Sequence, residues 1–411
     1  MIGFEKFTLA NGLRVLVHED SSTPLAAVNL VYDVGARDEF PDKTGFAHLF
    51  EHLMFGGSVN IPRFDEPLQL VGGENNAFTN NDITNYYITL PSHNLETAFW
   101  LESDRMLSLA FSEKSLEVQR HVVVEEFKER YLNEPYGDVW LLLRPLTYKV
   151  HPYQWATIGK EIAHVQQATL EDVKDFFKRF YCPNNAVLVV SGNVTTDLVK
   201  ELCAKWFADI PSGPANKRSL PAEPLQTEAR SLTVHRDVPF DAIYKAYHSC
   251  SRSDPEYYAI DLMSDLMSRG NSSRLYQQMV KNKKLFSEIH AYVTGDRDKG
   301  LFIIEGKLIK GVSPQVAETA LQEEIDAMQN IDVNPEELTK VKNKIESTLE
   351  YSSMSALNKA MRLAFAELLG DADYVNREIE LYEAVKPEDI REQAKKILRP
   401  ENCSTLYYLS N

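Results

Sequence analysis

Two histidines and a glutamate lie within five residues of an otherwise apolar segment, FAHLFEHLMF (46–55), in a chain with only ten histidines. On a helix each residue turns by about 100°, so His48, Glu51 and His52 project from one arc. Imidazoles at positions i and i+4 can share a tetrahedral zinc ion, and a carboxylate beside them can take a proton from a water that the metal activates. The order H-x-x-E-H reverses the H-E-x-x-H of common zinc proteases.

The alternative is a core helix that carries two surface histidines and simply packs its leucine and phenylalanine side chains. That explanation would suffice for a single histidine. Burying three ionisable groups without a partner is costly, because they lose their hydration in apolar surroundings. The five-residue pattern therefore favours a metal site.

Two histidines leave a catalytic zinc site one protein ligand short, because such sites usually combine three protein ligands with a water. A long helical stretch over residues 112–137 offers several carboxylates. By the same helical step, Glu126 lies on the rim of the apolar face of this stretch, whereas Glu125 points nearly opposite, into solvent. Glu126 is the better third ligand by geometry, and Glu117 on the other rim stays an alternative.

An internal repeat divides the chain into halves. The segment LEDVKDFFKRFYCPNNAVLVVSGN (170–193) returns as PEDIREQAKKILRPENCSTLYYLSN (387–411), and four matched residues keep one constant spacing. Amphipathic stretches at 95–110, 113–132, 168–181 and 194–208 predict helices, and alternating runs such as NYYITL predict strands. We expect an α+β fold of two homologous domains, each a mostly antiparallel sheet covered by helices on one side.

The expected boundaries are a catalytic zinc-binding domain at 1–212, a linker at 213–227 within a stretch rich in proline, serine and alanine, and a homologous domain at 228–411. In the second half, the positions that align with the H-x-x-E-H residues hold Asp261, Ser264 and Asp265. This copy has no imidazole pair and no base, so only the first domain should carry chemistry.

Composition narrows the class of protein further. A formal net charge of −16 repels phosphate backbones and anionic membranes, so neither nucleic acid nor a membrane is an expected partner. The four cysteines are far apart, without a C-x-x-C pair, which argues against a thiolate metal site or a disulfide framework. No apolar run is long enough to cross a bilayer, so a cytoplasmic location is expected, or a periplasmic one if a presequence was removed.

Together these segments resemble the pitrilysin or insulinase-like zinc peptidases, also called inverzincins, and are most similar to their two-domain processing-peptidase branch. The resemblance runs along nearly the whole chain, through LANGLRVLVHED, HLFEHLMF, GGENNAFTNNDITNYY, VVVEEFKERYLNEPYG and SSRLYQQMV. It implies a zinc cofactor bound by His48, His52 and Glu126, with Glu51 as the general base.

The same resemblance implies where substrate binds. GGENNAFTN contains the family's G-G-x-x-N-A-x-T pattern, so Asn76, Ala77, Phe78 and Thr79 should belong to an edge strand that holds extended substrate backbone. Such β-augmentation uses main-chain hydrogen bonds and accepts peptides of almost any sequence.

The chain departs from the family pattern at three positions. Gln119 stands where a further glutamate is common, and Val280 and Ser287 stand where an assisting arginine and tyrosine are expected. Some enzymes of this branch divide the work between a zinc-bearing subunit and a zinc-less homologue that carries the Arg/Tyr pair. The departures therefore predict the zinc-bearing half of a hetero-oligomer.

The expected function is a zinc-dependent endopeptidase acting on peptides or unfolded segments. One alternative is a non-catalytic or scaffold subunit related to processing-peptidase core proteins, against which the intact H-x-x-E-H and Glu126 argue. Another is a metal-dependent hydrolase of a different substrate, which the strand-like NAFTNNDITNYYITL disfavours because that segment suits an extended polypeptide.

Overall fold

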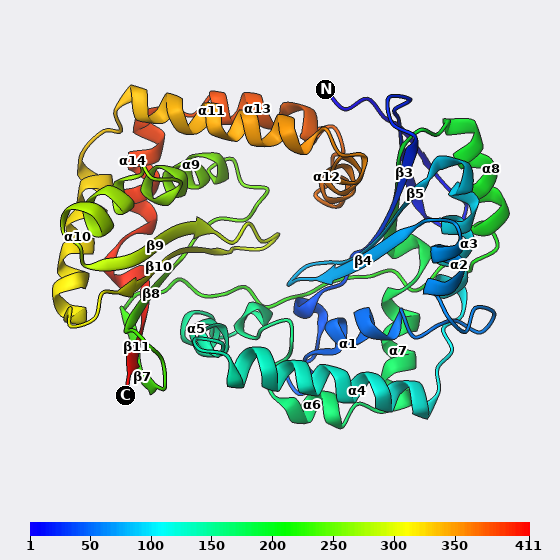
Figure 1. Cartoon of the computed structure of the whole chain (residues 1–411), viewed down its shortest axis with the longest axis horizontal. Helices are drawn as coiled ribbons and strands as arrows, with labels where there is room; N and C mark the ends of the chain where they lie inside the picture. Colours follow the sequence, from blue (N-terminus) through cyan, green and yellow to red (C-terminus); the bar gives the residue numbers. More distant parts are fainter. The chain divides into compact units, whose positions relative to one another are not determined.

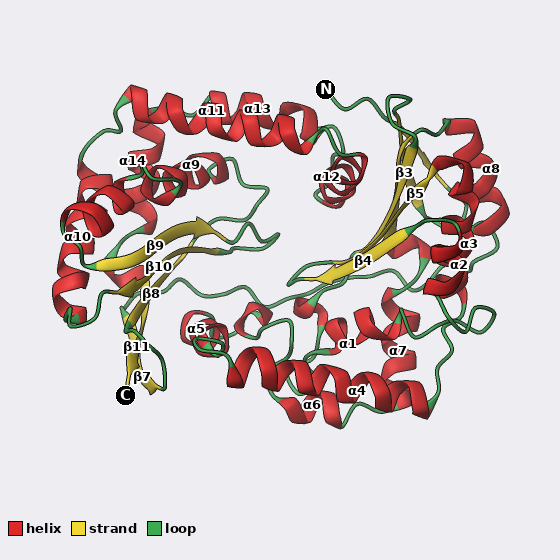
Figure 2. Ribbon diagram, viewed as in Figure 1, coloured by secondary structure: helices red, strands yellow, loops and turns green.

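The computed structural model describes the whole chain, from Met1 to Asn411, as two compact α+β units (Figures 1 and 2). The first unit comprises Met1–Lys128, Trp155–Leu220 and Leu349–Arg377, and the second comprises Glu129–Gln154, Pro221–Thr348 and Glu378–Asn411. Each unit contains one sheet. The predicted α+β class is confirmed.

The sheet of the first unit has six strands in the order β1-β2-β6-β3-β5-β4. Their bounds are β1 (Glu5–Thr8), β2 (Arg14–Glu19), β3 (Leu25–Tyr32), β4 (Glu74–Thr79), β5 (Thr84–Pro91) and β6 (Ala186–Gly192). Only β2 and β6 pair in parallel. Strand β4 pairs with β5 alone and forms one edge of the sheet.

The sheet of the second unit has five strands in the order β7-β11-β8-β10-β9. Their bounds are β7 (Arg230–Arg236), β8 (Ala242–His248), β9 (Phe286–Val293), β10 (Leu301–Leu308) and β11 (Cys403–Ser410). One pair, β7 with β11, is parallel. Both sheets are therefore mostly antiparallel, and the repeated strands, β6 and β11, occupy interior positions in both.

The helices that belong to the first unit are α1 (Phe46–Leu53), α2 (Asp65–Leu70), α3 (Leu95–Leu107), α4 (Glu113–Phe127), α6 (Ile162–Gln166), α7 (Leu170–Phe180), α8 (Thr196–Trp206) and α12 (Ala356–Leu368). The second unit contains α5 (Val139–Thr147), α9 (Tyr257–Ser268), α10 (Pro314–Asn330) and α14 (Pro387–Ile397). Two more helices, α11 (Pro335–Ser352) and α13 (Tyr374–Glu383), cross from one unit to the other. None of the helices combines the length and apolar character needed to span a membrane.

Each sheet carries a helix from the opposite half of the sequence. In the first unit, α12 packs its alanines and Leu363 against Val187 and Val189 of β6. In the second unit, α5 packs Val139 and Leu143 against β8 and β11. Other helices contact each sheet from across it, α3 and α8 in the first unit and α9 and α10 in the second, so each sheet has helices on both sides (Figure 1).

The two units do not match the expected continuous domains 1–212 and 228–411. Residues 129–154 lie in the second unit, and residues 349–377 lie in the first. The arrangement of helices also differs from the expectation of helices on one side only. The expected linker, residues 213–227, contains neither helix nor strand.

A partly buried ion pair joins α12 to the residue that follows β2. It leads to a prediction about how stability depends on pH. Lys359 Nζ lies 2.7 Å from Asp20 Oδ2, and the hydrogen bond from Lys359 is the main cause that holds the pKa of Asp20 well below its usual range. A lowered carboxyl pKa stabilises the fold above the unfolded pKa of about 3.9, and this stabilisation is lost as the pH falls. Asp20→Asn should therefore lower the free energy of unfolding, measured by urea denaturation, by roughly 1 kcal/mol at pH 7 and by a smaller amount at pH 3, below the unfolded pKa. A difference that is the same at both pH values would contradict this role.

Candidate active site

Helix α1 carries His48, Glu51 and His52 on one side and buries Phe46, Ala47, Leu49, Phe50 and Leu53 on the other. The helix begins after Gly45, whose φ of +87° is one that L side chains rarely adopt. A Cβ at this position would also lie 2.7 Å from the carbonyl oxygen of Ile158. A glycine is therefore required where the chain turns into this helix.

The first turn of α1 is bound by a carboxylate from outside the helix. Glu39 Oε2 accepts a hydrogen bond from the Gly45 N–H at 2.9 Å, and its Oε1 accepts one from the Ala47 N–H at 2.8 Å. Burial raises the pKa of Glu39 to about 8, while these two N–H groups act to lower it. No motif or period in the sequence indicates a role for Glu39.

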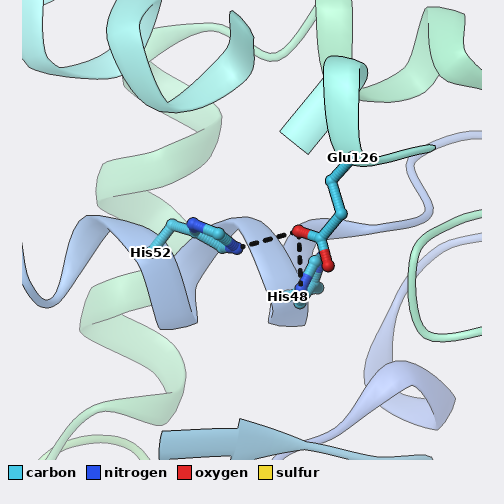
Figure 3. Close-up of side chains that lie close together, drawn as sticks. All are labelled: His48, His52 and Glu126. Carbon is cyan, nitrogen blue, oxygen red and sulfur yellow. Dashed lines mark ion pairs between the residues drawn. The ribbon is translucent and has the colours of Figure 1, made fainter. Parts of the chain in front are cut away.

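Glu126, near the end of α4, reaches the two histidines of α1 (Figure 3). Its Oε2 lies 3.4 Å from His52 Nε2 and 3.7 Å from His48 Nε2. The three ligand atoms lie within 4.8 Å of one another, and no other group of three histidine, cysteine or acidic side chains in the chain could hold a metal ion in this way. All three side chains are partly exposed, so the site is open to solvent on one side.

The two distances from Glu126 to the histidines are close to those of a tetrahedral metal site. Zinc bonds of about 2.0–2.2 Å at tetrahedral angles separate neighbouring donor atoms by about 3.4 Å. Two imidazole nitrogens and one carboxylate oxygen also form a common donor set of catalytic zinc sites, which leave the fourth position open. The residues present are therefore suited to zinc, with a free position for water or substrate.

Glu51 projects from the same helix but takes no part in the group of three. Its Oε2 accepts a hydrogen bond of 2.6 Å from Thr79 Oγ1, at the end of β4. Burial raises the pKa of the Glu51 carboxyl, whereas the hydrogen bond from Thr79 and the nearby His52 lower it. The Glu51 side chain thus connects the helix of the histidines to the edge strand.

The other glutamates considered on α4 lie elsewhere. Glu125 is half-exposed and pairs with Lys128 at 2.7 Å, and Glu117 is exposed and pairs with Arg120. Neither side chain joins the histidines. The alternative that the sequence left open, Glu117, is therefore not placed to act as the third ligand.

The four residues expected to bind substrate all lie on β4, beside α1. Along this strand exposed residues alternate with half-buried ones, and Asn76 and Phe78 are on the exposed face. The half-buried residues are Ala77 and Thr79. The Asn76 side chain accepts a hydrogen bond of 2.8 Å from the Ala77 N–H. Because β4 has a partner strand on one side only, its outer edge offers main-chain groups to an added strand.

In the second unit, helix α9 is the counterpart of α1, and it carries an ion pair at the position that aligns with His52. Asp265 pairs with Arg269 at 2.8 Å, and Asp261 accepts a hydrogen bond of 2.6 Å from Tyr382 Oη. A guanidinium therefore neutralises the carboxylate at the position that aligns with His52. Ser287 lies on the edge strand β9 and donates to the Lys307 carbonyl at 3.1 Å.

The fold and the site define a protein of two related α+β units, of which only the first carries a zinc-type ligand set. Family models match the chain in two places: "Insulinase (Peptidase family M16)" over residues 14–148 and "Peptidase M16 inactive domain" over residues 167–345. The chain belongs to peptidase family M16, and the resemblance to the insulinase-like peptidases is confirmed. The second matched range contains Asp261, Ser264 and Asp265.

Several relatives span most of the chain. The zinc protease PqqE of Helicobacter pylori is 32% identical over 419 residues, which cover 98% of this chain and 92% of the relative. A probable mitochondrial-processing peptidase subunit beta of Arabidopsis thaliana is 27% identical over 312 residues, 72% of this chain and 57% of that protein. The crystal structure of a protease from Helicobacter pylori superposes with a TM-score of 0.93 at 27% identity, covering 99% of this chain and all of that one. The two-domain fold of this family is therefore the fold of the chain.

Proposed function

We propose that this protein is a zinc-dependent endopeptidase that cleaves peptides or unfolded segments. The observation that carries the proposal is the convergence of His48, His52 and Glu126, with Glu51 placed between them and an open strand edge. The names of its M16 relatives, which include zinc proteases, support the same metal and the same reaction class.

A zinc ion held by His48, His52 and Glu126 would polarise a carbonyl oxygen and lower the pKa of a coordinated water. Glu51 supplies the base. Thr79 binds its Oε2, so its Oε1, which this hydroxyl leaves free, would accept the proton of the attacking water and return it to the departing amide nitrogen. The hydrogen bond from Thr79 also opposes the effect of burial on the pKa of Glu51, which favours the ionised base.

The substrate would bind as an extended strand along β4. Main-chain hydrogen bonds to this edge do not depend on the substrate sequence, and the partly exposed ring of Phe78 adds an apolar contact. A folded protein cannot present a free strand of this kind at low cost. We therefore expect peptides and unfolded segments to be cleaved in preference to compact proteins.

Peptide hydrolysis before and after metal removal tests the proposal. The purified protein should cleave a quenched fluorescent peptide, lose this activity to a zinc chelator, and regain it with one equivalent of zinc. A folded protein of similar length serves as the control substrate and should resist cleavage. Stoichiometric zinc without any hydrolysis, with or without added homologues, would instead favour a non-catalytic subunit.

The proposed enzyme includes a partner, a homologous zinc-less subunit with the Arg/Tyr pair. The support lies in Val280 and Ser287, which offer neither a guanidinium nor a phenol at the expected positions. Arg274, the nearest upstream arginine, is held by Glu337 at 2.8 Å. Without such donors the developing oxyanion lacks stabilisation that is typically worth about 10²–10³ in rate.

We predict that the isolated chain binds zinc but is a slow peptidase, and that a zinc-less homologue from the same organism raises its turnover by about 10²–10³. The measurement compares the chain, the homologue and their mixture on one peptide. The mixture made with a Glu51→Gln chain is the control and should stay inactive. Full activity of the isolated chain, unchanged by the homologue, would rule out the divided site.

A further inference from the structure

A short segment before α1, residues 35–39, contacts both α1 and the turn that follows β4, and its residues Ala36–Asp38 form a 3-10 helix. On one side it reaches the helix: the two oxygens of Glu39 accept the N–H groups of Gly45 and Ala47. On the other side it reaches the β4–β5 turn: the Ala36 N–H donates to the Asn80 carbonyl at 3.1 Å, and the Arg37 N–H donates to the Asn81 carbonyl at 2.9 Å.

Two ion pairs with little exposure hold this segment in place. Arg37 is only 4% exposed and pairs with Asp82 at 3.0 Å, in the same β4–β5 turn. Asp38 pairs with Arg218 at 2.6 Å. Gly35 permits the close approach, because a Cβ there would lie 2.5 Å from the Asp82 nitrogen. Glu39 therefore extends from a segment whose backbone is bound to the β4–β5 turn.

Helix α1 has no capping side chain of its own. It has eight residues, and its N-cap position is Gly45, which has no side chain to accept a hydrogen bond. Each of the two N–H groups needs an oxygen lone pair, which the Glu39 carboxyl provides whether it is ionised or neutral. Glu39 is 6% exposed, so water does not substitute for it.

We infer that Glu39 is a positioning residue, which holds the metal-ligand helix in place relative to the substrate-binding strand. Its carboxyl is not part of the metal-ligand group and acts through the backbone of α1, at Ala47, the residue before His48. The inference rests on the proposed zinc site. Partners beyond the direct ligands typically change metal affinity by about 10–100-fold, and we expect an effect of this size from Glu39.

The variant Glu39→Gln tests this, because it keeps the size of the side chain but turns an N–H₂ group toward one of the two backbone donors. Zinc affinity, measured by competition with a chromophoric chelator, should fall about 10–100-fold relative to the parent protein. The visible spectrum of the cobalt-substituted protein should also change, because it reports ligand geometry. Glu39→Ala, which removes both acceptors, should weaken zinc binding further.

A destabilised control separates positioning from general stability. Thr195→Ala removes the side chain that accepts the Leu198 N–H at the start of α8, and should lower the thermal midpoint without changing zinc affinity or the cobalt spectrum. If Glu39→Gln folds and binds zinc within twofold of the parent protein, the inference is wrong. If the parent protein itself binds no zinc, the proposed function fails instead.

A measurement on the unaltered protein covers the case in which neither Glu39 variant folds. Amide hydrogen exchange should be slow at Ala47, as slow as in the core of α1, because its N–H is held by a buried carboxyl. Rapid exchange at Ala47, as at an ordinary helix start, would also refute the role of Glu39.

Discussion

Glu51→Gln should leave the zinc content of the protein unchanged and reduce peptide turnover by roughly 10²–10⁴-fold. Glutamine keeps the size of the side chain, and its amide oxygen can still accept the Thr79 hydroxyl. The amide cannot take a proton from water. Peptide binding should therefore survive while hydrolysis is lost. Turnover of a quenched fluorescent peptide measures the hydrolysis, and elemental analysis of the same sample measures the zinc content.

Glu117→Gln is the matched control for this variant. Glu117 is exposed and pairs with Arg120, away from the histidines, so its turnover and its zinc content should equal those of the parent protein. Parent-like turnover by Glu51→Gln would remove Glu51 from the mechanism. Loss of zinc from that variant would mean instead that Glu51 helps to hold the metal.

The second large effect is expected at the metal ligands. His48→Ala, His52→Ala and Glu126→Gln each remove one of three protein donors from the site. If three ligands share a binding free energy of about 10–16 kcal/mol, losing one costs roughly 3–5 kcal/mol, about 10³-fold in affinity. Purified variants should contain little zinc and show no measurable hydrolysis.

Glu125→Gln is the control on the same helix. It lies next to Glu126 in sequence but pairs with Lys128 on the exposed face, so the variant should keep one zinc per chain. Full zinc occupancy in Glu126→Gln together with loss in Glu125→Gln would contradict the geometry in Figure 3.

Helical periodicity placed all three residues of this group among the candidates. The amphipathic stretches at 95–110, 113–132, 168–181 and 194–208 correspond to α3, α4, α7 and α8. In α4 the buried residues include Val123, Val124 and Phe127, which leaves Glu126 on the rim of the buried face, next to α1. Periodicity could not decide between the two rims, because that choice depends on where the neighbouring helix lies.

The exchange of α5 and α12 between the units could not be read from the sequence. Amphipathicity shows that a helix has an apolar face, but not which sheet that face will cover. The internal repeat suggested continuous halves because it aligns each strand and helix with its copy in order. The exchanged helices cover the faces lined by Val187 and Val189 in one unit and by Leu406 and Tyr408 in the other.

Glu39 was missed for a related reason. Its contacts with Gly45 and Ala47 cross a loop, so no helical or strand period relates these residues. One local signal was available. A helix whose N-cap is glycine, with ionisable groups in its first turns, needs an acceptor from elsewhere, and Glu39 is a carboxylate a few residues upstream.

Anomalous diffraction at the zinc edge, from crystals grown with one equivalent of zinc, tests the central claim most directly. We predict a single peak about 2.0–2.1 Å from the Nε2 atoms of His48 and His52 and about 2.0–2.2 Å from a carboxylate oxygen of Glu126. Glu51 should lie beside the peak without bonding to it. The absence of a peak at these residues, or zinc held by other side chains, would contradict the account.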